Sequence, residues 1–218
     1  MTQMTSLGPH QGMPVRQLGN PLAQAQAAMI LVHGRGATAE SILELVPEIH
    51  HPQFAFLAPQ SADHTWYPYS FLAPINQNEP GLSSGLATIG AVLQQVLQAG
   101  IPVERVALLG FSQGACLALE FAARHARRYG AVIGLSGGLI GPEGTPRNYE
   151  GSLQGTPVFL GCSVPGLHIP KERVEESAHV LQQLGGAVTT CLYPNMGHTI
   201  NDDEIQSVRS LMTGMLAG

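Results

Sequence analysis

Short apolar segments alternate with longer amphipathic ones along most of the 218-residue chain. Each short segment is bounded by Gly or Pro. Uninterrupted apolar runs of this length are typical of strands buried on both faces, as in a parallel sheet covered by helices. The expected strands are residues 27–34, 53–59, 105–112, 130–137, 157–163 and 187–194.

Apolar residues at steps of three and four predict the helices between these strands. One such stripe extends over residues 82–96 and stops at Gly100. Similar spacing over 174–184 and 205–215 predicts two more helices, and the segment 115–123 is apolar nearly all round, as expected behind a central strand. The alternation predicts an α/β fold, a mostly parallel twisted sheet with helices on both faces.

The domain organisation follows from length and composition. A chain with 44% apolar and 11% charged residues can bury one substantial core. No linker is long or polar enough to divide it, so residues 27–218 are expected to form a single domain. Residues 1–26 are expected to be an N-terminal segment that can include a first edge strand. The loops 60–81 and 138–156 are long, and long ordered loops are often functional.

Charge and composition narrow the range of partners. The net charge is −5 and the ten Lys and Arg residues are scattered, so neither nucleic acid nor a membrane surface is an expected partner. The N-terminus lacks a basic start and an apolar run, which favours a cytoplasmic protein. Three irregularly spaced cysteines suit neither a disulfide framework nor a zinc site, and we expect no cofactor and no metal.

The sequence LLGFSQGACLALEF places Gly110, Ser112 and Gly114 between a predicted strand and a predicted buried helix. A nucleophilic serine requires a tight, strained turn whose neighbours carry no side chains, so that its hydroxyl is exposed above the sheet. The helix that follows directs its N-terminus toward developing negative charge. The alternative is that Ser112 only caps the helix.

A second glycine-containing loop follows the first predicted strand. In HGRG, His33, Gly34 and Gly36 form a loop whose backbone can approach a substrate closely. Such a loop can direct an N–H group at a developing oxyanion, with the amide after the nucleophile as the other donor. We assign these donors to the backbone of Arg35 and of Gln113. The alternative is an ordinary turn between strand and helix.

A candidate general base follows the last predicted strand, in LYPNMGHTINDDE. His198 lies there in a loop at the carboxyl end of a strand, from which it can reach back to Ser112. The chain order, nucleophile first and histidine last, is that of the α/β-hydrolases. Solvent or packing explains the other histidines, and His10 is expected to lie in a tail.

Together, HGRG, GFSQG and MGHT resemble the carboxylesterase/phospholipase branch of the α/β-hydrolase superfamily, which includes acyl-protein thioesterases. The likeness extends over about residues 27–217. It implies an α/β-hydrolase fold with no separate lid domain, with Ser112 as nucleophile and His198 as base. It also implies an acyl pocket lined by the stretch 65–74. The expected pocket residues are Trp66, Phe71, Leu72, Gly81, Leu167 and Met196, with core packing as the alternative for the aromatic ones.

The resemblance fails at the third member of the catalytic triad. It implies an Asp in the loop after strand 157–163, in a stretch resembling Asp-x-Asp-Pro-His-apolar-Pro. This chain has GCSVPGLHIP there, with no Asp or Glu between Gly151 and Lys171. A gap-free match places Gly166 at the Asp and Leu167 at the Pro, and Val164 replaces the earlier acid.

Other carboxylates are weak substitutes for that Asp. Glu172 falls in the first turn of a predicted helix, where the helix dipole explains it. Asn201 and Glu204 form a predicted capping box, which accounts for the acidic run 202–204. Glu143 follows another strand, but Gly and Pro before it leave its direction open.

Three functions remain open. The first is a serine hydrolase of carboxylic esters or thioesters, impaired or altered by the missing acid, that acts as a monomer or homodimer on a small-molecule ester or acyl substrate. The second is a natural or engineered variant of the fold that uses His198 as base or nucleophile in non-hydrolytic chemistry; Gly81, where a bulky pocket residue is expected, adds a hint of enlargement. The third is a non-catalytic protein that binds an acyl ligand.

Overall fold

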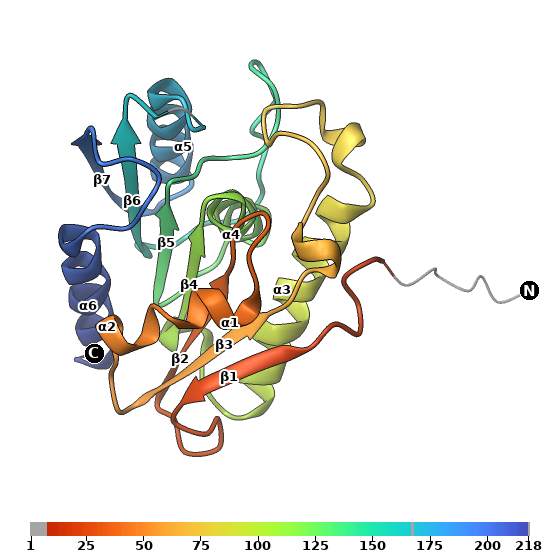
Figure 1. Cartoon of the computed structure of the whole chain (residues 1–218). Coiled ribbons are helices and arrows are strands. Elements are labelled where there is room, and N and C mark those ends of the chain that lie inside the picture. The colour runs from red at the N-terminus through yellow and green to blue at the C-terminus, as the bar shows by residue number, and fades with distance from the viewer. Residues whose placement is uncertain (1–7, 167, 218) are drawn as a thin grey trace, which may run out of the picture.

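A seven-stranded sheet forms the centre of the computed structural model, which describes residues 8–166 and 168–217 (Figure 1). The strand order is β1-β3-β2-β4-β5-β6-β7, and all neighbours are parallel except β1 and β3. The strands are β1 (Val15–Gly19), β2 (Ala27–Val32), β3 (Phe54–Pro59), β4 (Val106–Phe111), β5 (Ala131–Leu135), β6 (Pro157–Val164) and β7 (Ala187–Pro194). The central strands are buried on both faces, which is why they have no polar alternation.

Helices cover both faces of the sheet (Figure 1). Helices α3, α4 and α5 pack on one face, and α1, α2 and α6 pack on the other. Their bounds are α1 (Ala39–Leu43), α2 (Val46–Ile49), α3 (Gly81–Gln98), α4 (Gln113–Arg124), α5 (Lys171–Gln183) and α6 (Asp202–Leu216). Short 3₁₀ turns occur at Ala62–His64, Ile75–Asn78 and Val103–Arg105.

Alternate residues of each strand enter two separate cores. In β2, Ala28, Ile30 and Val32 face the core under α3 and α4, whereas the residues between them face the core under α1 and α6. Helix α4 lies behind the central strands and is buried along all but its last residue. This double burial fixes the carboxyl end of β4, where the candidate nucleophile begins the turn into α4.

The α/β prediction is confirmed, and the six expected strands are all present with ends shifted by at most a few residues. The predicted capping box of the last helix is also confirmed, because the Asn201 side chain accepts from Glu204 N and the Glu204 side chain accepts from Asn201 N. Helices α1 and α2 were not predicted, since spans of five and four residues are too short to show a helical stripe.

The expectation that His10 lies in a tail is wrong. His10 is buried, its Nε2 contacts the Trp66 carbonyl oxygen at 2.8 Å, and its Nδ1 accepts from Ala62 N at 3.1 Å. Both ring nitrogens are therefore used to join the N-terminal segment to the loop after β3. Sequence pattern could not show this, because a lone histidine among polar residues carries no periodicity.

Across residues 8–166 and 168–217, none of the helices has the length and apolar character needed to cross a bilayer.

Candidate active site

Ser112 occupies a strained turn between β4 and α4. Its φ of 56° and ψ of −120° lie in a region that L-residues rarely adopt. The flanking glycines are required by contact: a Cβ at Gly110 would lie 2.2 Å from the Gly114 carbonyl oxygen, and one at Gly114 would lie 2.0 Å from the Val32 carbonyl oxygen. The G-x-S-x-G spacing therefore follows from close packing of three backbone segments.

His198 reaches Ser112 from the loop between β7 and α6. Its Nε2 lies 2.9 Å from Ser112 Oγ, which is hydrogen-bond distance. The Phe111 ring packs beside the imidazole with centroids 5.0 Å apart. The loop itself is fixed to β6, because Gly197 N donates to Ser163 Oγ at 3.1 Å. Two residues 86 positions apart in sequence thus form a nucleophile–base pair in geometry.

The environment of His198 favours the neutral imidazole. Partial burial lowers its pKa below the ordinary histidine value of 6.5, and the neighbouring His168 lowers it further. The two rings meet edge to face with centroids 4.9 Å apart. A neutral imidazole at physiological pH has a free lone pair, so it can take the proton of Ser112.

The HGRG loop lies directly against the serine turn. A Cβ on Gly34 would be 3.4 Å from the Ser112 Cβ, so the loop backbone is in contact with the turn. His33 is fully buried, its Nε2 accepts from Ser61 N, and its Nδ1 lies 2.8 Å from the Gly34 carbonyl oxygen. Because Nε2 accepts, Nδ1 carries the proton, and burial lowers the pKa of His33. His33 is thus neutral, and its two ring nitrogens bond to backbone and stabilise the loop.

A hollow of about 460 Å³ opens in front of Ser112. Arg35, Gln113 and His198 line it together with Ser112. Among the hydrogen bonds of the described residues, none uses the backbone N–H of Arg35 or of Gln113. Backbone N–H groups without a partner are the kind of donor that an oxyanion needs.

The side chains of Gln113 and Arg35 bond to the backbone of a neighbouring loop, which the sequence did not predict. The buried Gln113 side chain accepts from Trp66 N at 2.9 Å and donates to the Tyr67 carbonyl oxygen at 2.8 Å. The Arg35 guanidinium donates to the carbonyl oxygens of Tyr67, Pro68 and Tyr69 at 2.7–2.9 Å. Both side chains therefore hold the loop that forms one wall of the hollow. No sequence pattern signals such bonds to a loop backbone.

The expected pocket residues separate into two groups. Phe71 lines the hollow, and the structure adds Tyr67 and Tyr69 to that wall. Trp66 is fully buried in the core, where its Nε1 donates to the His33 carbonyl oxygen at 2.9 Å.

The other expected pocket residues lie away from the wall of the hollow. Leu72 is partly buried against the core, and Met196 accepts from Asn201 Nδ2 through its sulfur. A Cβ on Gly81 would lie 2.7 Å from the Trp66 carbonyl oxygen, so this glycine serves close backbone packing and not an enlarged pocket. Leu167 lies outside the described residues.

No carboxylate completes the Ser112–His198 pair within the described part of the chain. The only hydrogen bond found there for His198 is the one to Ser112, and none of the ion pairs includes it. Gly166 lies beside His198, and both line a cavity of about 250 Å³. A Cβ on Gly166 would lie 2.7 Å from the Ile169 carbonyl oxygen and 2.9 Å from that of Ser163, so the loop closes tightly around this glycine.

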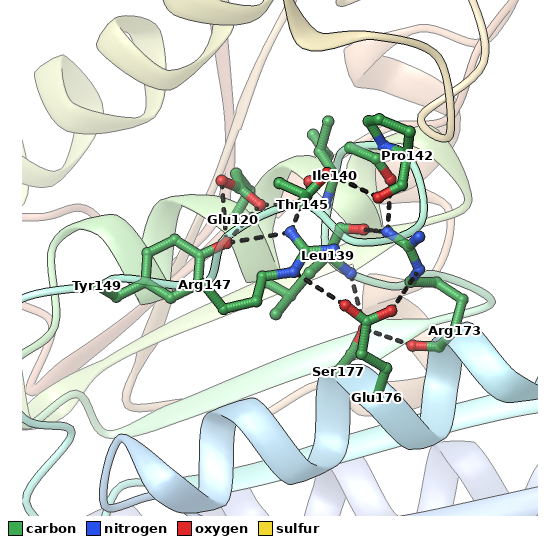
Figure 2. Close-up of polar contacts among 11 residues, drawn as sticks. Glu120, Leu139, Ile140, Pro142, Thr145, Arg147, Tyr149, Arg173, Glu176 and Ser177 are labelled. Atoms are coloured by element: carbon green, nitrogen blue, oxygen red, sulfur yellow. Dashed lines mark hydrogen bonds and ion pairs between the residues drawn. The ribbon is translucent and has the colours of Figure 1, made fainter.

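The loop that carries Glu143 is fixed by a network of charged side chains (Figure 2). Arg173 donates to the carbonyl oxygens of Leu139 and Gly141, and Glu120 accepts from Ile140 N at 3.0 Å. Glu143 is exposed and has no bond to His198.

The other carboxylates considered as substitutes for the triad Asp are either hydrogen-bonded to other groups or exposed to solvent. Glu172 is exposed on α5, and Asp203 accepts from the Tyr193 hydroxyl. Glu204 is fully buried, closes the capping box, and has its pKa raised to about 7 by burial. None of these carboxylates bonds to His198.

Two cysteines near the site do not compete with the serine. Burial raises the pKa of Cys116 to about 12 and that of Cys162 to about 11. A thiol with such a pKa stays protonated at neutral pH and is a poor nucleophile. Neither thiol is therefore a candidate nucleophile at neutral pH.

The class of the protein follows from this arrangement. A mostly parallel sheet, a serine on the tight turn after a central strand and a histidine after the last strand define an α/β-hydrolase. A sequence model of the phospholipase/carboxylesterase family matches residues 17–215, and the chain belongs to this family. The resemblance inferred from the three motifs is thereby confirmed.

Relatives support the same assignment. The crystal structure of a phospholipase/carboxylesterase from Dyadobacter fermentans is 43% identical, with a TM-score of 0.89 over 92% of this chain and 96% of that one. Acyl-protein thioesterase 1 of Gibberella zeae is 28% identical over 65% of this chain and 61% of its own length. A probable carboxylesterase of Oryza sativa is 24% identical over 93% of this chain and 84% of its own. The chain thus spans less than two thirds of the thioesterase that it matches.

Proposed function

We propose that this protein hydrolyses carboxylic esters or thioesters through an acyl-enzyme formed on Ser112. The observation that carries the proposal is the 2.9 Å contact between His198 Nε2 and Ser112 Oγ, beside two unbonded backbone N–H groups in one hollow. Membership of the phospholipase/carboxylesterase family supports a hydrolase of this type. No metal or cofactor takes part in the proposed reaction.

The steps follow from the roles of these groups. His198 Nε2 takes the proton of Ser112 as the serine oxygen bonds to the acyl carbon of the substrate. The resulting oxyanion accepts hydrogen bonds from the N–H groups of Arg35 and Gln113. The imidazolium then returns the proton to the departing alcohol or thiol. In the second half-reaction His198 takes a proton from water as the water oxygen bonds to the acyl carbon, and it returns that proton to the Ser112 oxygen as the acid leaves.

The missing acid sets the expected rate. Disabling the acid of a serine triad lowers turnover by about four orders of magnitude, because the imidazole loses control of its tautomer, yet some catalysis over water remains. That loss corresponds to about 5–6 kcal/mol of barrier, at about 1.36 kcal/mol per tenfold change in rate. We therefore propose a slow hydrolase that uses Ser112 and the two backbone donors, with a base that lacks its usual partner.

The hollow constrains the substrate. Its volume of about 460 Å³ and its tyrosine and phenylalanine wall suit a small-molecule ester with an apolar acyl group. The scattered positive charge still argues against nucleic acid as substrate. We propose that residues 27–218 form a single domain. We also propose that the protein acts in the cytoplasm.

Hydrolysis of short p-nitrophenyl esters and acyl thioesters tests the proposal. The wild-type protein is expected to show slow, saturable turnover that Ser112→Ala removes. His198→Ala is expected to lower turnover toward the same background. Turnover that survives Ser112→Ala while His198→Ala removes it would indicate base chemistry without an acyl-enzyme. Tight binding of an acyl ligand with no turnover would indicate a binding protein.

A further inference from the structure

A second cavity lies against His198, next to the hollow that contains Ser112. Its volume is about 250 Å³, and it is lined by Ser136, Ser163, Gly166, His168 and His198 among others. Ser136 follows β5, Gly166 follows β6 and His198 follows β7, so the carboxyl ends of three adjacent parallel strands converge on it. This edge of a parallel sheet is where ligands of α/β proteins bind.

Ser136 is one of the residues that line this cavity, and its hydroxyl is an unused polar group. The residue is 1% exposed, and its Oγ is buried with no hydrogen-bond partner among the described residues. Its backbone is fixed, since Ser136 N donates to the Gly161 carbonyl oxygen at 2.7 Å and φ is 56°. A buried hydroxyl without a partner is unfavourable, so a ligand that accepts a hydrogen bond would be stabilised there.

His198 offers the second polar group. Its Nε2 is engaged by Ser112, which lines the hollow but not the cavity. Nδ1 is therefore the ring nitrogen left for a ligand in the cavity. When Nε2 accepts the serine proton, Nδ1 must carry a proton of its own, so the ligand that fits is a hydrogen-bond acceptor, best a negatively charged one.

We propose that this cavity binds a small monocarboxylate of one or two carbons, which accepts the Nδ1–H of His198 and the Ser136 hydroxyl and so replaces the missing acid of the triad. No covalent bond forms or breaks with the carboxylate. The serine proton goes to Nε2 and then to the leaving group, while the carboxylate stays ionised and stabilises the imidazolium. The rate enhancement rests on the proposed function, whereas the binding does not.

The size of the cavity agrees with such a ligand. A water molecule takes about 30 Å³ in the liquid, so the cavity has room for formate or acetate together with several waters.

Binding is tested apart from catalysis by titrating formate into ¹⁵N-histidine-labelled protein and following the His198 imidazole by NMR. The wild-type protein and Ser112→Ala are expected to show a saturable shift, which chloride at equal ionic strength does not produce. Ser136→Ala should weaken formate binding about threefold to tenfold, the range of one lost hydrogen bond. Ser61→Ala is the matched control, because Ser61 Oγ is also buried and unpartnered but lies outside the cavity. No saturable shift, or equal weakening by both variants, would overturn the proposal.

Catalysis is tested by measuring ester hydrolysis at rising formate and constant ionic strength. Hydrolysis is expected to increase about tenfold or more, part of the four orders of magnitude that a triad acid supplies. Saturable formate binding without a gain in rate would refute the role as acid, and a gain that persists in Ser112→Ala would show that formate itself acts as base. Formate binding in a protein with no hydrolysis at all would overturn the proposed function while the binding site stands.

Discussion

Two polar regions of this molecule differ in how completely their side chains are partnered. The Glu120 carboxylate, which is 1% exposed, accepts from Ile140 N and from the Tyr149 hydroxyl (Figure 2). It also accepts from Arg124 Nε at 2.7 Å. Around His198, the imidazole bonds Ser112, while no carboxylate of the described residues bonds the ring.

The difference between the two regions lies in what each network holds. The Glu120 network fixes the loop after β5 to α4 and α5. Its loss should therefore lower the stability of the fold. The Ser112–His198 pair is held by the sheet, the serine turn and the Gly197–Ser163 bond, none of which needs a triad acid. The contact between Ser112 and His198 is therefore formed without a carboxylate partner among the described residues.

The largest effect is expected from Glu120→Ala. Removing the carboxylate leaves Ile140 N and the Tyr149 hydroxyl buried without their acceptor, which should destabilise the fold by about 3 kcal/mol. Urea unfolding measures the change. Glu175→Ala is the control, since Glu175 pairs with Lys171 on an exposed helix face and should cost about 0.5 kcal/mol or less. Equal losses in both variants would show that the Glu120 network is not special.

Gly166→Asp tests the other region. A carboxylate beside His198 should raise ester turnover by about tenfold to hundredfold, less than the four orders of magnitude of an intact triad. The gain is limited because a Cβ at Gly166 meets the Ile169 and Ser163 carbonyl oxygens within 2.9 Å, so the loop must shift. Gly166→Asn has the same shape without the charge. A gain of the same size in Gly166→Asn would contradict the electrostatic explanation.

Glu204 is buried like Glu120, but no ion pair of the described residues includes it. Its contribution to the free energy of unfolding should therefore depend on pH. Its pKa of about 7 lies above the ordinary 4.5, so the native state binds more protons between these values and stability falls as pH rises through that window. Glu204→Gln keeps the capping box and should stabilise the protein by about 1–2 kcal/mol above pH 7, with little change near pH 5. Urea unfolding at both pH values checks this. A Gln variant that is less stable at high pH would refute it.

The smallest effect concerns His168. Burial is the larger cause and His168 the smaller cause of the low pKa of His198. The base must be neutral, so kcat/KM falls as pH drops through that pKa, and this acid limb should lie below 6.5. His168→Gln removes the second cause and should move the limb upward by less than about one pH unit. A downward movement in the pH–rate profile would contradict the assignment.

Much of the fold and part of the candidate site could be predicted from the sequence, because the patterns that indicate them are local. Buried strands bounded by Gly or Pro, and a serine between two glycines at a strand–helix junction, depend on residues that adjoin one another. The Ser112–His198 contact was within reach because chain order and strand ends constrain where loops meet. Other features could not be predicted, because each depends on contact with backbone that is distant in sequence. They are the side-chain bonds of Gln113 and Arg35 to the loop, the burial of His10 and the close packing at Gly81.

The most direct test of the central claim is labelling with a fluorophosphonate probe followed by intact-mass and peptide analysis. A serine activated by His198 should form one covalent adduct, at Ser112, even with the triad acid missing. Ser112→Ala should form none, and His198→Ala should label more slowly. An unlabelled wild-type protein, or an adduct at another residue, would contradict the claim that Ser112 and His198 form a working nucleophile–base pair.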